Sequence, residues 1–512
     1  MSSANPSIKR NLFANYVAQI YNMGLAIVMA PVYLAYMGRE AYGLIGFFTM
    51  MAAWFVLLDL GLTPTLIRET ARFRGGAIGV ETLRAFLRAL EIIFGIVSLL
   101  GAAGLVLSSH QIAVHWLKVK ELPIDQVTAA VMLMGLTIPP RWIAGLYRAV
   151  INGFEHQVWL GGFNVLISTL RYVGVLIVFL TLGATPVHFF AYQLVVAIVE
   201  LSGAGFMTYI LIRRDSAPQE QFSWRPLMGS LTFSLTIAFT STAWVIISQT
   251  DKLILSKLLL LAQYGVFSLA VVAAGAISSL ASPFTQALLP RLTKLVTEKD
   301  NDAFDRLYSG ATQSVGVLVV PAVVALSFFA HPVLRAWTGN LQIAHDAAPI
   351  LCLYAIGYGW IALSSFPFYL QYAKGDLRLH FIGVALQLVL LVPLFYLGAK
   401  HYGAIGTGTV WAVMNGLYAL CWSPLIHARL YKGHHWRWMI HDVASIAVPT
   451  FLVGWLLALV VPWPVGRWPT LAVLAALGIV LVAVAGGASS FVRDSVRAKL
   501  PAWIARLSKV WS

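Results

Sequence analysis

Two arginines lie deep inside long apolar stretches of the sequence, where charged side chains are rare. Arg141 lies in the apolar run 127–150 and Arg171 in the next run, 158–182. A guanidinium stays charged, and its planar fork binds two phosphate oxygens at once. A charge at membrane depth costs roughly 2.5–3.5 kcal/mol, so both side chains are expected to face the inside of a helix bundle. Two guanidinium groups at similar depth suit a pyrophosphate.

Two carboxylates occupy the same kind of apolar run. Glu200 is at a similar depth in the run 187–212, so a structural Arg–Glu pair is as good an interpretation of Arg171 as ligand binding. For Arg141 we favour the ligand role. Asp59, in Leu58-Asp59-Leu60-Gly61, is interpreted as a helix cap or a partner of a loop arginine. Both carboxylates are candidates for a coupling charge or a structural charge.

Other polar residues form a stripe and a pair. The first apolar run carries a polar stripe at helical spacing, made of Asn11, Asn15, Gln19 and Asn22. Buried amides of this kind bind sugar hydroxyls or hold helices together, and the length of the stripe favours the lining of a cavity. The pair Asp251-Lys252 is interpreted as an interfacial ion pair or as part of a cavity mouth.

The elements that must position these residues are membrane helices. Of the 512 residues, 59% are hydrophobic and 11% charged, whereas a soluble domain has about 25% charged residues. A membrane helix needs roughly 20 apolar residues. About fourteen such spans are predicted: 12–36, 42–66, 86–107, 127–150, 158–182, 187–212, 228–250, 262–289, 310–332, 348–370, 380–398, 402–426, 443–462 and 469–491. The fold class is therefore an all-α integral membrane protein.

The basic residues set the orientation. The formal net charge is +15, and 25 of the 35 Lys and Arg residues fall on the side that carries both termini. The positive-inside rule places that side in the cytoplasm. The same asymmetry explains the charge without a nucleic-acid partner.

A weak internal repeat divides the chain. Tyr42-Gly43 opens the second span and Tyr264-Gly265, 222 residues later, opens the eighth. The repeat predicts two six-helix lobes with the same orientation in the membrane. A transporter of this kind has a central site between the lobes and works by alternating access. The predicted divisions are an N-lobe at 1–215, a C-lobe at 216–428, a two-helix appendage at 429–491 and an amphipathic cytoplasmic tail at 492–512.

Enzyme and cofactor motifs are missing from the sequence. It has no Walker loop, catalytic triad or zinc motif. We expect no catalytic residue, metal or cofactor, while coupling to H+ or Na+ stays open.

Several short motifs, taken in order, resemble those of the Wzx-type oligosaccharide flippases, which share a superfamily with MATE drug exporters and MurJ lipid II flippases. The segments that carry the resemblance are 11–15, 38–43, 58–62 followed by Arg68, 250–255, 262–265, 289–292 and 402–406. The resemblance implies a V-shaped fold of two lobes plus two extra C-terminal helices. It also implies export of an undecaprenyl-pyrophosphate-linked oligosaccharide across the bacterial inner membrane, for O-antigen, capsule or exopolysaccharide synthesis.

Two other functions compete with this one. A cation-coupled exporter of small molecules requires an ion site, for which Glu200 and Asp59 are the only plausible carriers. A scaffold in a polysaccharide assembly complex, beside the polymerase machinery, would tolerate mutations in the cavity. Membrane lipids are expected partners in every case.

Overall fold

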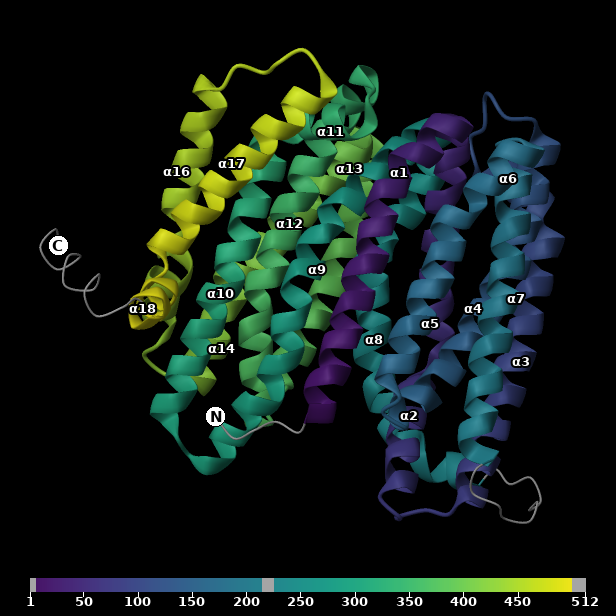
Figure 1. The fold of residues 1–512 in the computed structure, drawn as a ribbon, viewed down its shortest axis with the longest axis horizontal. Coiled ribbons are helices and arrows are strands. Elements are labelled where there is room, and N and C mark those ends of the chain that lie inside the picture. Colours follow the sequence, from purple (N-terminus) through teal and green to yellow (C-terminus); the bar gives the residue numbers. More distant parts are fainter. Residues whose placement is uncertain (1–5, 214–224, 500–512) are drawn as a thin grey trace, which may run out of the picture. The chain divides into compact units, whose positions relative to one another are not determined.

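The computed structural model describes residues 6–213 and 225–499, except for the side chains of residues 6–16, 213, 225–238, 240, 282–283, 285–287 and 499. Regular structure in these residues is helical (Figure 1), apart from an isolated bridge between Lys118 and Leu260. The chain forms two compact units, Met1–Ser268 and Leu269–Ser512, whose boundary lies inside helix α9 (Leu261–Glu298).

The described residues of the first unit form eight helices and the start of α9. They are α1 (Pro6–Phe55), α2 (Leu62–Arg74), α3 (Val80–Gln111), α4 (Ile124–Gly153), α5 (Gln157–Thr169), α6 (Val175–Leu182), α7 (Pro186–Arg213) and α8 (Arg225–Leu258). A π-helical turn, η3 (Leu170–Gly174), joins α5 to α6.

The second unit contains the rest of α9 and nine more helices. They are α10 (Asn301–Phe328), α11 (Ala330–Thr338), α12 (Leu341–Lys374), α13 (Arg378–Leu417), α14 (Ser423–Leu430), α15 (His435–Arg437), α16 (Ser445–Val460), α17 (Arg467–Ala488) and α18 (Ser490–Lys499). Two π-helical turns are η4 (Tyr418–Trp422) and η5 (Trp438–Ala444).

Eleven helical segments of the described residues are long and apolar enough to cross a membrane. The segment Val17–Asp59 has 43 residues, so it would extend about 65 Å, twice the hydrocarbon thickness. It is interrupted at Gly38, where φ is 84°, and the long helix α13 is interrupted at Gly403, where φ is 56°. These breaks coincide with two predicted span boundaries. The total of fourteen spans stays a prediction.

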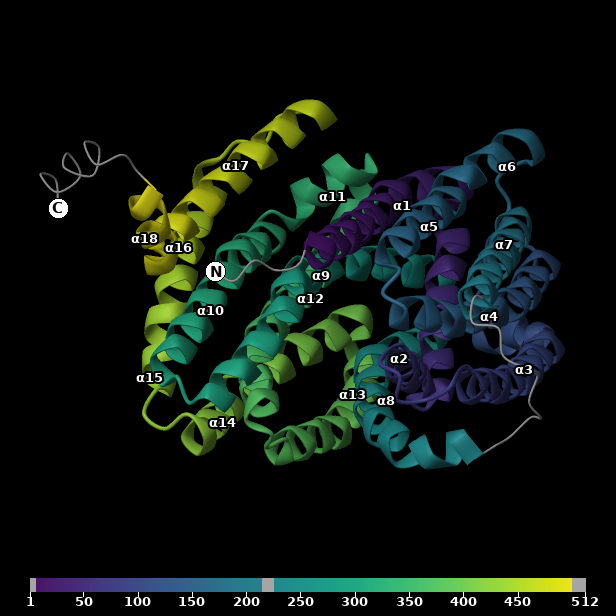
Figure 2. The same ribbon diagram turned by 60° about the horizontal axis from the view of Figure 1, so that its bottom comes forward.

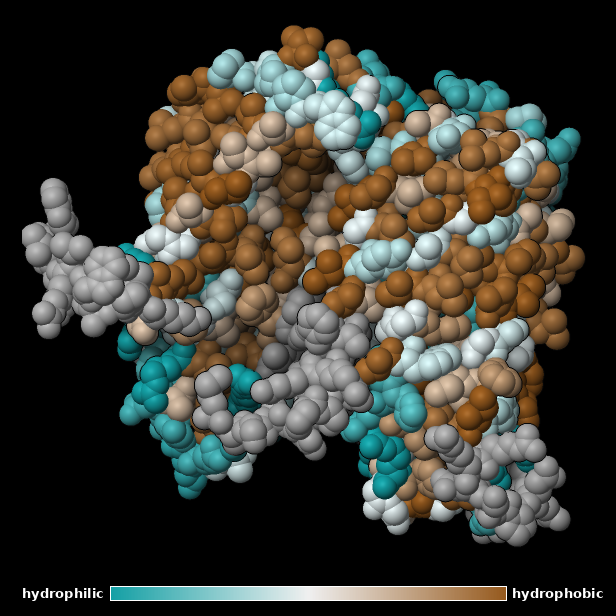
Figure 3. All heavy atoms as spheres, in the orientation of Figure 1, coloured by the Kyte–Doolittle hydropathy of each residue, from teal (hydrophilic) through white to brown (hydrophobic). Residues whose placement is uncertain are grey.

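The surface supports membrane insertion. In Figure 3 hydrophobic residues cover the middle of each unit, and hydrophilic residues gather towards its ends. Many large apolar side chains are exposed, such as Leu107 at 82% and Leu180 at 74%, as expected of side chains that face lipid tails. The chain is a multi-pass membrane protein.

The second predicted span is not one continuous helix, which corrects the prediction for 42–66. Helix α1 ends at Phe55, a 3-10 turn follows at Val56–Asp59, and Leu60 and Gly61 are both left-handed, with φ of 46° and 73°. A leucine with positive φ is strained, whereas glycine adopts this conformation freely. Helix α2 then starts in a new direction.

Two glycines allow α1 and α9 to cross closely within the first unit. A Cβ atom on Gly43 would lie 2.3 Å from the carbonyl oxygen of Leu261, and one on Gly265 would lie 2.4 Å from that of Arg39. Both pairs of equivalent positions are 222 residues apart. Each glycine thus approaches the carbonyl oxygen of the equivalent residue on the other helix, as expected of two segments related by a local two-fold axis.

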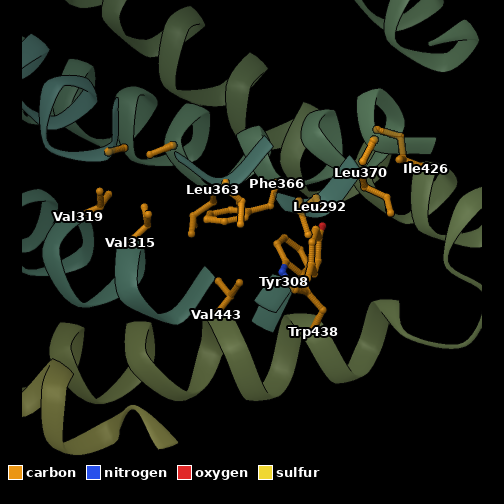
Figure 4. Close-up of a cluster of buried hydrophobic side chains, with 14 of the residues drawn as sticks. Leu292, Tyr308, Val315, Val319, Leu363, Phe366, Leu370, Ile426, Trp438 and Val443 are labelled. Atoms are coloured by element: carbon orange, nitrogen blue, oxygen red, sulfur yellow. The ribbon is translucent and has the colours of Figure 1, made fainter. Parts of the chain in front are cut away.

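The core of the second unit is a cluster of large apolar side chains. Figure 4 shows Leu292 of α9, Tyr308 of α10, Phe366 of α12, Ile426 of α14 and Trp438 of η5 packed together. All five are at most 4% exposed. The cluster thus joins the helices of the C-terminal half to one another.

Helix α18 covers the start of the predicted cytoplasmic tail, and residues 500–512 lie outside the described residues. The buried Gln313 of α10 fixes where α18 begins. Its Oε1 accepts from Ser489 Oγ at 2.8 Å and from the backbone N–H of Phe491 at 3.0 Å. Its Nε2 donates to Asp442 at 2.8 Å. This amide connects three elements of the second unit.

Candidate functional site

Helices α4 and α7 pack side by side in the first unit (Figure 2). Two pairs of polar side chains connect them like rungs. In the first rung Arg141 Nη2 donates to Gln193 Oε1 at 2.5 Å. In the second, Arg148 Nη1 donates to Glu200 Oε1. The partners are 52 residues apart in both rungs, and each helix contributes positions seven residues apart. Such positions lie on one helix face because seven residues make almost two turns.

The second rung is part of an ion triad. Arg171 Nη2 donates to the other carboxylate oxygen of Glu200 at 2.5 Å. The Glu200 side chain is 2% exposed, while those of Arg148 and Arg171 are 34% and 22% exposed. The structural interpretation of Arg171 and Glu200 therefore has a geometric basis, because both oxygens of the carboxylate are paired.

The π-helical turn η3 positions the side chain of Arg171 in the ion triad. Its backbone carbonyl oxygens accept side-chain hydrogen bonds from α7 and α1. Tyr192 donates to Leu170 O at 2.9 Å, Gln193 Nε2 to Arg171 O at 3.0 Å, and Tyr33 to Tyr172 O at 2.6 Å. The widened turn thus sits between two helices that hold its backbone. Such π-helical turns occur often at functional sites.

Arg141 differs from the other two arginines. Among the described residues no carboxylate lies within ion-pair distance of Arg141, whereas Arg148 and Arg171 both pair with Glu200. The guanidinium carbon of Arg141 lies 5.0 Å from the centroid of the Phe48 ring, a cation–π contact. The two side chains shown in contact with this guanidinium, Gln193 and Phe48, are therefore neutral. Helix α4 runs through Pro139 and Pro140 without a break, so Arg141 lies in the middle of a continuous helix.

A cavity of about 390 Å³ lies next to these rungs. Arg141, Trp142 and Arg148 of α4 line one side, and Ser241 and Thr242 of α8 line another. The turn between α1 and α2 completes the wall. The cavity therefore presents two guanidinium groups and several hydroxyl groups at membrane depth.

Asp59 lies on the wall that the broken helix provides. Its Oδ1 accepts hydrogen bonds from the backbone N–H of Thr63 at 3.2 Å and from the Thr63 hydroxyl. A carboxylate in this position caps the start of α2, as one of the two sequence interpretations proposed. It also faces the cavity of Arg141 and Arg148.

The amide stripe on the first helix is only partly described. The side chains of Asn11 and Asn15 lie outside the described residues, and Gln19 is exposed. Asn22 Oδ1 accepts from Ser168 Oγ of α5 at 3.0 Å. This contact holds two helices together, which is the alternative that the sequence left open.

Asp251 and Lys252 form an ion pair in α8, with Lys252 Nζ 3.3 Å from Asp251 Oδ1. The side chains of Asp251 and Lys252 are 1% and 16% exposed, so the pair is largely buried within the protein. Neither residue lines the cavity described above. The assignment of Asp251 and Lys252 to substrate binding stays a prediction.

Sequence reasoning missed Arg148 and Gln193. Arg148 was counted among the basic residues on the side of the termini, but α4 continues to Gly153 and Arg148 lies inside it. The signal that identifies both residues is the spacing of seven, from Arg141 to Arg148 and from Gln193 to Glu200.

Comparison with known proteins supports a transport role for this architecture. The family model described as "Polysaccharide biosynthesis protein" matches residues 8–296, and that of "Lipid II flippase MurJ" matches residues 276–476. A Shigella flexneri protein named "Putative O-antigen transporter" is 21% identical over 416 residues, which cover 80% of this chain and 96% of that protein.

Solved structures share the fold. A lipid II flippase MurJ in an inward closed conformation has a TM-score of 0.72 at 13% identity, covering 94% of this chain and 99% of that one. An inward-facing multidrug resistance MATE family transporter has a TM-score of 0.66 at 15% identity, covering 81% and 98%. Because the first family model matches more than half of the sequence, the chain belongs to the polysaccharide biosynthesis protein family.

Proposed function

We propose that this protein is a flippase that moves an oligosaccharide linked through pyrophosphate to undecaprenol from the cytoplasmic to the outer leaflet of the bacterial inner membrane. Family membership and the O-antigen transporter relative support this activity. The structural observation that carries it is Arg141, a guanidinium inside a membrane helix that forms no ion pair with a carboxylate in the described part of the chain. Transport, rather than catalysis, is the function of this site.

The cavity suits a phosphate group between sugars and a lipid. Arg141 offers its planar donor fork to phosphate oxygens, and Arg148 lies two turns further along the same face of α4. Ser241 and Thr242 supply hydroxyl groups for sugars. Two arginines and one carboxylate, Asp59, are among the described residues that line the cavity, so it has an excess of positive charge that favours an anion.

Coupling to H+ or Na+ is assigned to Asp59. Among the described residues that line the cavity it is the only carboxylate, and it forms no ion pair with an arginine. Glu200 is a poorer candidate because both of its oxygens are already paired with arginines.

The orientation rests on charge. Since 25 of the 35 Lys and Arg residues lie on the side of the termini, the proposal places both termini in the cytoplasm. The substrate then enters from the cytoplasmic side, and the polysaccharide polymerase machinery is the proposed partner after export.

A MATE-like exporter of small molecules is the alternative that the fold also permits. The excess of guanidinium groups at this site would repel small molecules that carry positive charge. A scaffold function would not explain a charged side chain at Arg141, whose placement in a membrane helix is costly.

Deletion of the gene in its host, followed by complementation, tests the proposal. Loss of surface polysaccharide with accumulation of lipid-linked oligosaccharide in the cytoplasmic leaflet is the expected result. Normal polysaccharide with changed drug sensitivity would favour the exporter. Full complementation by cavity variants such as Arg141→Gln would favour the scaffold.

A further inference from the structure

A second pocket, in the second unit, lies far along the chain from the arginine cavity. It encloses about 710 Å³ and is formed by the end of α9, the start of α10, the end of α12 and the residues after α14. Each of three elements contributes one lysine: Lys299 after α9, Lys374 at the end of α12, and Lys432 after α14. We call this the lysine pocket. Figures 1 and 2 place the α9–α10 connection and α14 at the same end of this unit.

The lysine pocket has an excess of positive charge. Asp305 is the only carboxylate among its described lining residues. That carboxylate is already engaged, because it accepts a hydrogen bond from Tyr431 and lies 3.4 Å from His434 Nε2. Within the described part of the chain, neither Lys299 nor Lys432 forms an ion pair. Two ammonium groups are therefore available to a ligand.

The third ammonium is fixed in place. Lys374 Nζ donates to the carbonyl oxygen of Leu430 and lies 5.8 Å and 5.7 Å from the rings of Phe304 and Tyr431. One acceptor leaves two of its three protons for a ligand. A lysine held by a carbonyl oxygen and two aromatic rings presents its ammonium group at a defined position and loses little entropy when an anion binds.

The location of the lysine pocket identifies the kind of anion. It lies at the ends of α9, α10 and α12, on the side that the positive-inside rule assigns to the cytoplasm. Aliphatic side chains, Leu295 and Val296, line it beside the lysines. A ligand with a phosphate head and apolar chains meets both features, and basic pockets between membrane helices on this side bind phospholipid head groups.

We propose that the lysine pocket binds an anionic phospholipid of the cytoplasmic leaflet through its phosphate. Lys299, Lys374 and Lys432 surround the phosphate, and the aliphatic wall contacts the start of the acyl chains. This site is separate from the arginine cavity and does not depend on the flippase activity.

Native mass spectrometry of the purified full chain in detergent tests the proposal, with cardiolipin or phosphatidylcholine added. The first variant is the triple substitution Lys299→Gln, Lys374→Gln and Lys432→Gln. The second omits Lys374, whose contacts contribute to the fold. The control removes three exposed positive charges elsewhere in the same unit, by Arg291→Gln, Lys294→Gln and Arg378→Gln.

The wild type is expected to retain cardiolipin in preference to phosphatidylcholine. A lysine near an anionic headgroup contributes about a fivefold gain in affinity, so the triple variant should bind at least about tenfold more weakly and the double variant several-fold more weakly. The control should bind like the wild type. Equal losses in the control and the lysine variants would refute a specific site. Two results would refute a phospholipid ligand. The first is equal binding of cardiolipin and phosphatidylcholine by the wild type. The second is displacement of cardiolipin by free inorganic pyrophosphate at the same concentration.

Discussion

Replacement of Glu200 by glutamine tests whether the ion triad is structural. Glutamine keeps the volume of the side chain and removes the charge that Arg148 and Arg171 share. Because Glu200 is 2% exposed, the two guanidinium groups lose their buried partner, and removal of one member of a buried ion pair costs about 3–5 kcal/mol. The arginines are 34% and 22% exposed, so we expect about 3 kcal/mol, the lower end of that range.

The assay is unfolding of the purified protein in mixed micelles, followed by circular dichroism. A double-mutant cycle with Arg171→Gln should show a coupling energy of at least about 1 kcal/mol, because the double variant leaves one charge fewer unpaired. The control is Glu155→Gln, whose partner is Arg74 at 3.1 Å and whose side chain is 67% exposed. It should cost less than about 1 kcal/mol. A loss for Glu200→Gln as small as that of the control would refute the structural role of the triad.

Three further changes have expected outcomes. Gly43→Ala should destabilise the protein by about 1–3 kcal/mol in the same unfolding assay, because its Cβ would overlap the Leu261 carbonyl oxygen. The control is Gly104→Ala, whose new Cβ would lie in open space, and it should leave the stability unchanged. Asp59→Asn should abolish any response of flipping in proteoliposomes to an imposed proton or sodium gradient, and a retained response would exclude Asp59 as the coupling group. Gln313→Ala should lower the thermal stability by about 1–3 kcal/mol, because several buried polar groups lose their partner, and an unchanged unfolding midpoint would contradict the network.

The membrane architecture was largely predictable from the sequence, because the bilayer requires long apolar helices and favours basic residues on its cytoplasmic side. The breaks at Gly38 and Gly403 fall where the sequence predicts that spans end. The broken second span was not predicted. Hydropathy averages over a window and does not register two left-handed residues, Leu60 and Gly61, inside an apolar run.

The candidate site was predictable only as a set of unusual residues. Arg141, Arg171 and Glu200 were identified from their depth, yet depth does not say which charges meet. The pairing depends on the parallel packing of α4 and α7, a tertiary contact that joins positions 52 residues apart. Arg148 was missed because, near the end of the predicted span 127–150, it was counted with the basic residues on the side of the termini.

The central claim is that a guanidinium without a carboxylate partner binds the pyrophosphate of the substrate. The most direct measurement is the rate at which purified wild type, Arg141→Gln and Arg141→Lys flip a pyrophosphate-linked oligosaccharide lipid in proteoliposomes. Hydrogen bonds to a charged group contribute about 1.5–3 kcal/mol, so Arg141→Gln should lower the rate at least about tenfold. Arg141→Lys should be intermediate because it keeps the charge and loses the fork. A wild-type rate in folded Arg141→Gln, or no flipping by the wild type, would contradict the account.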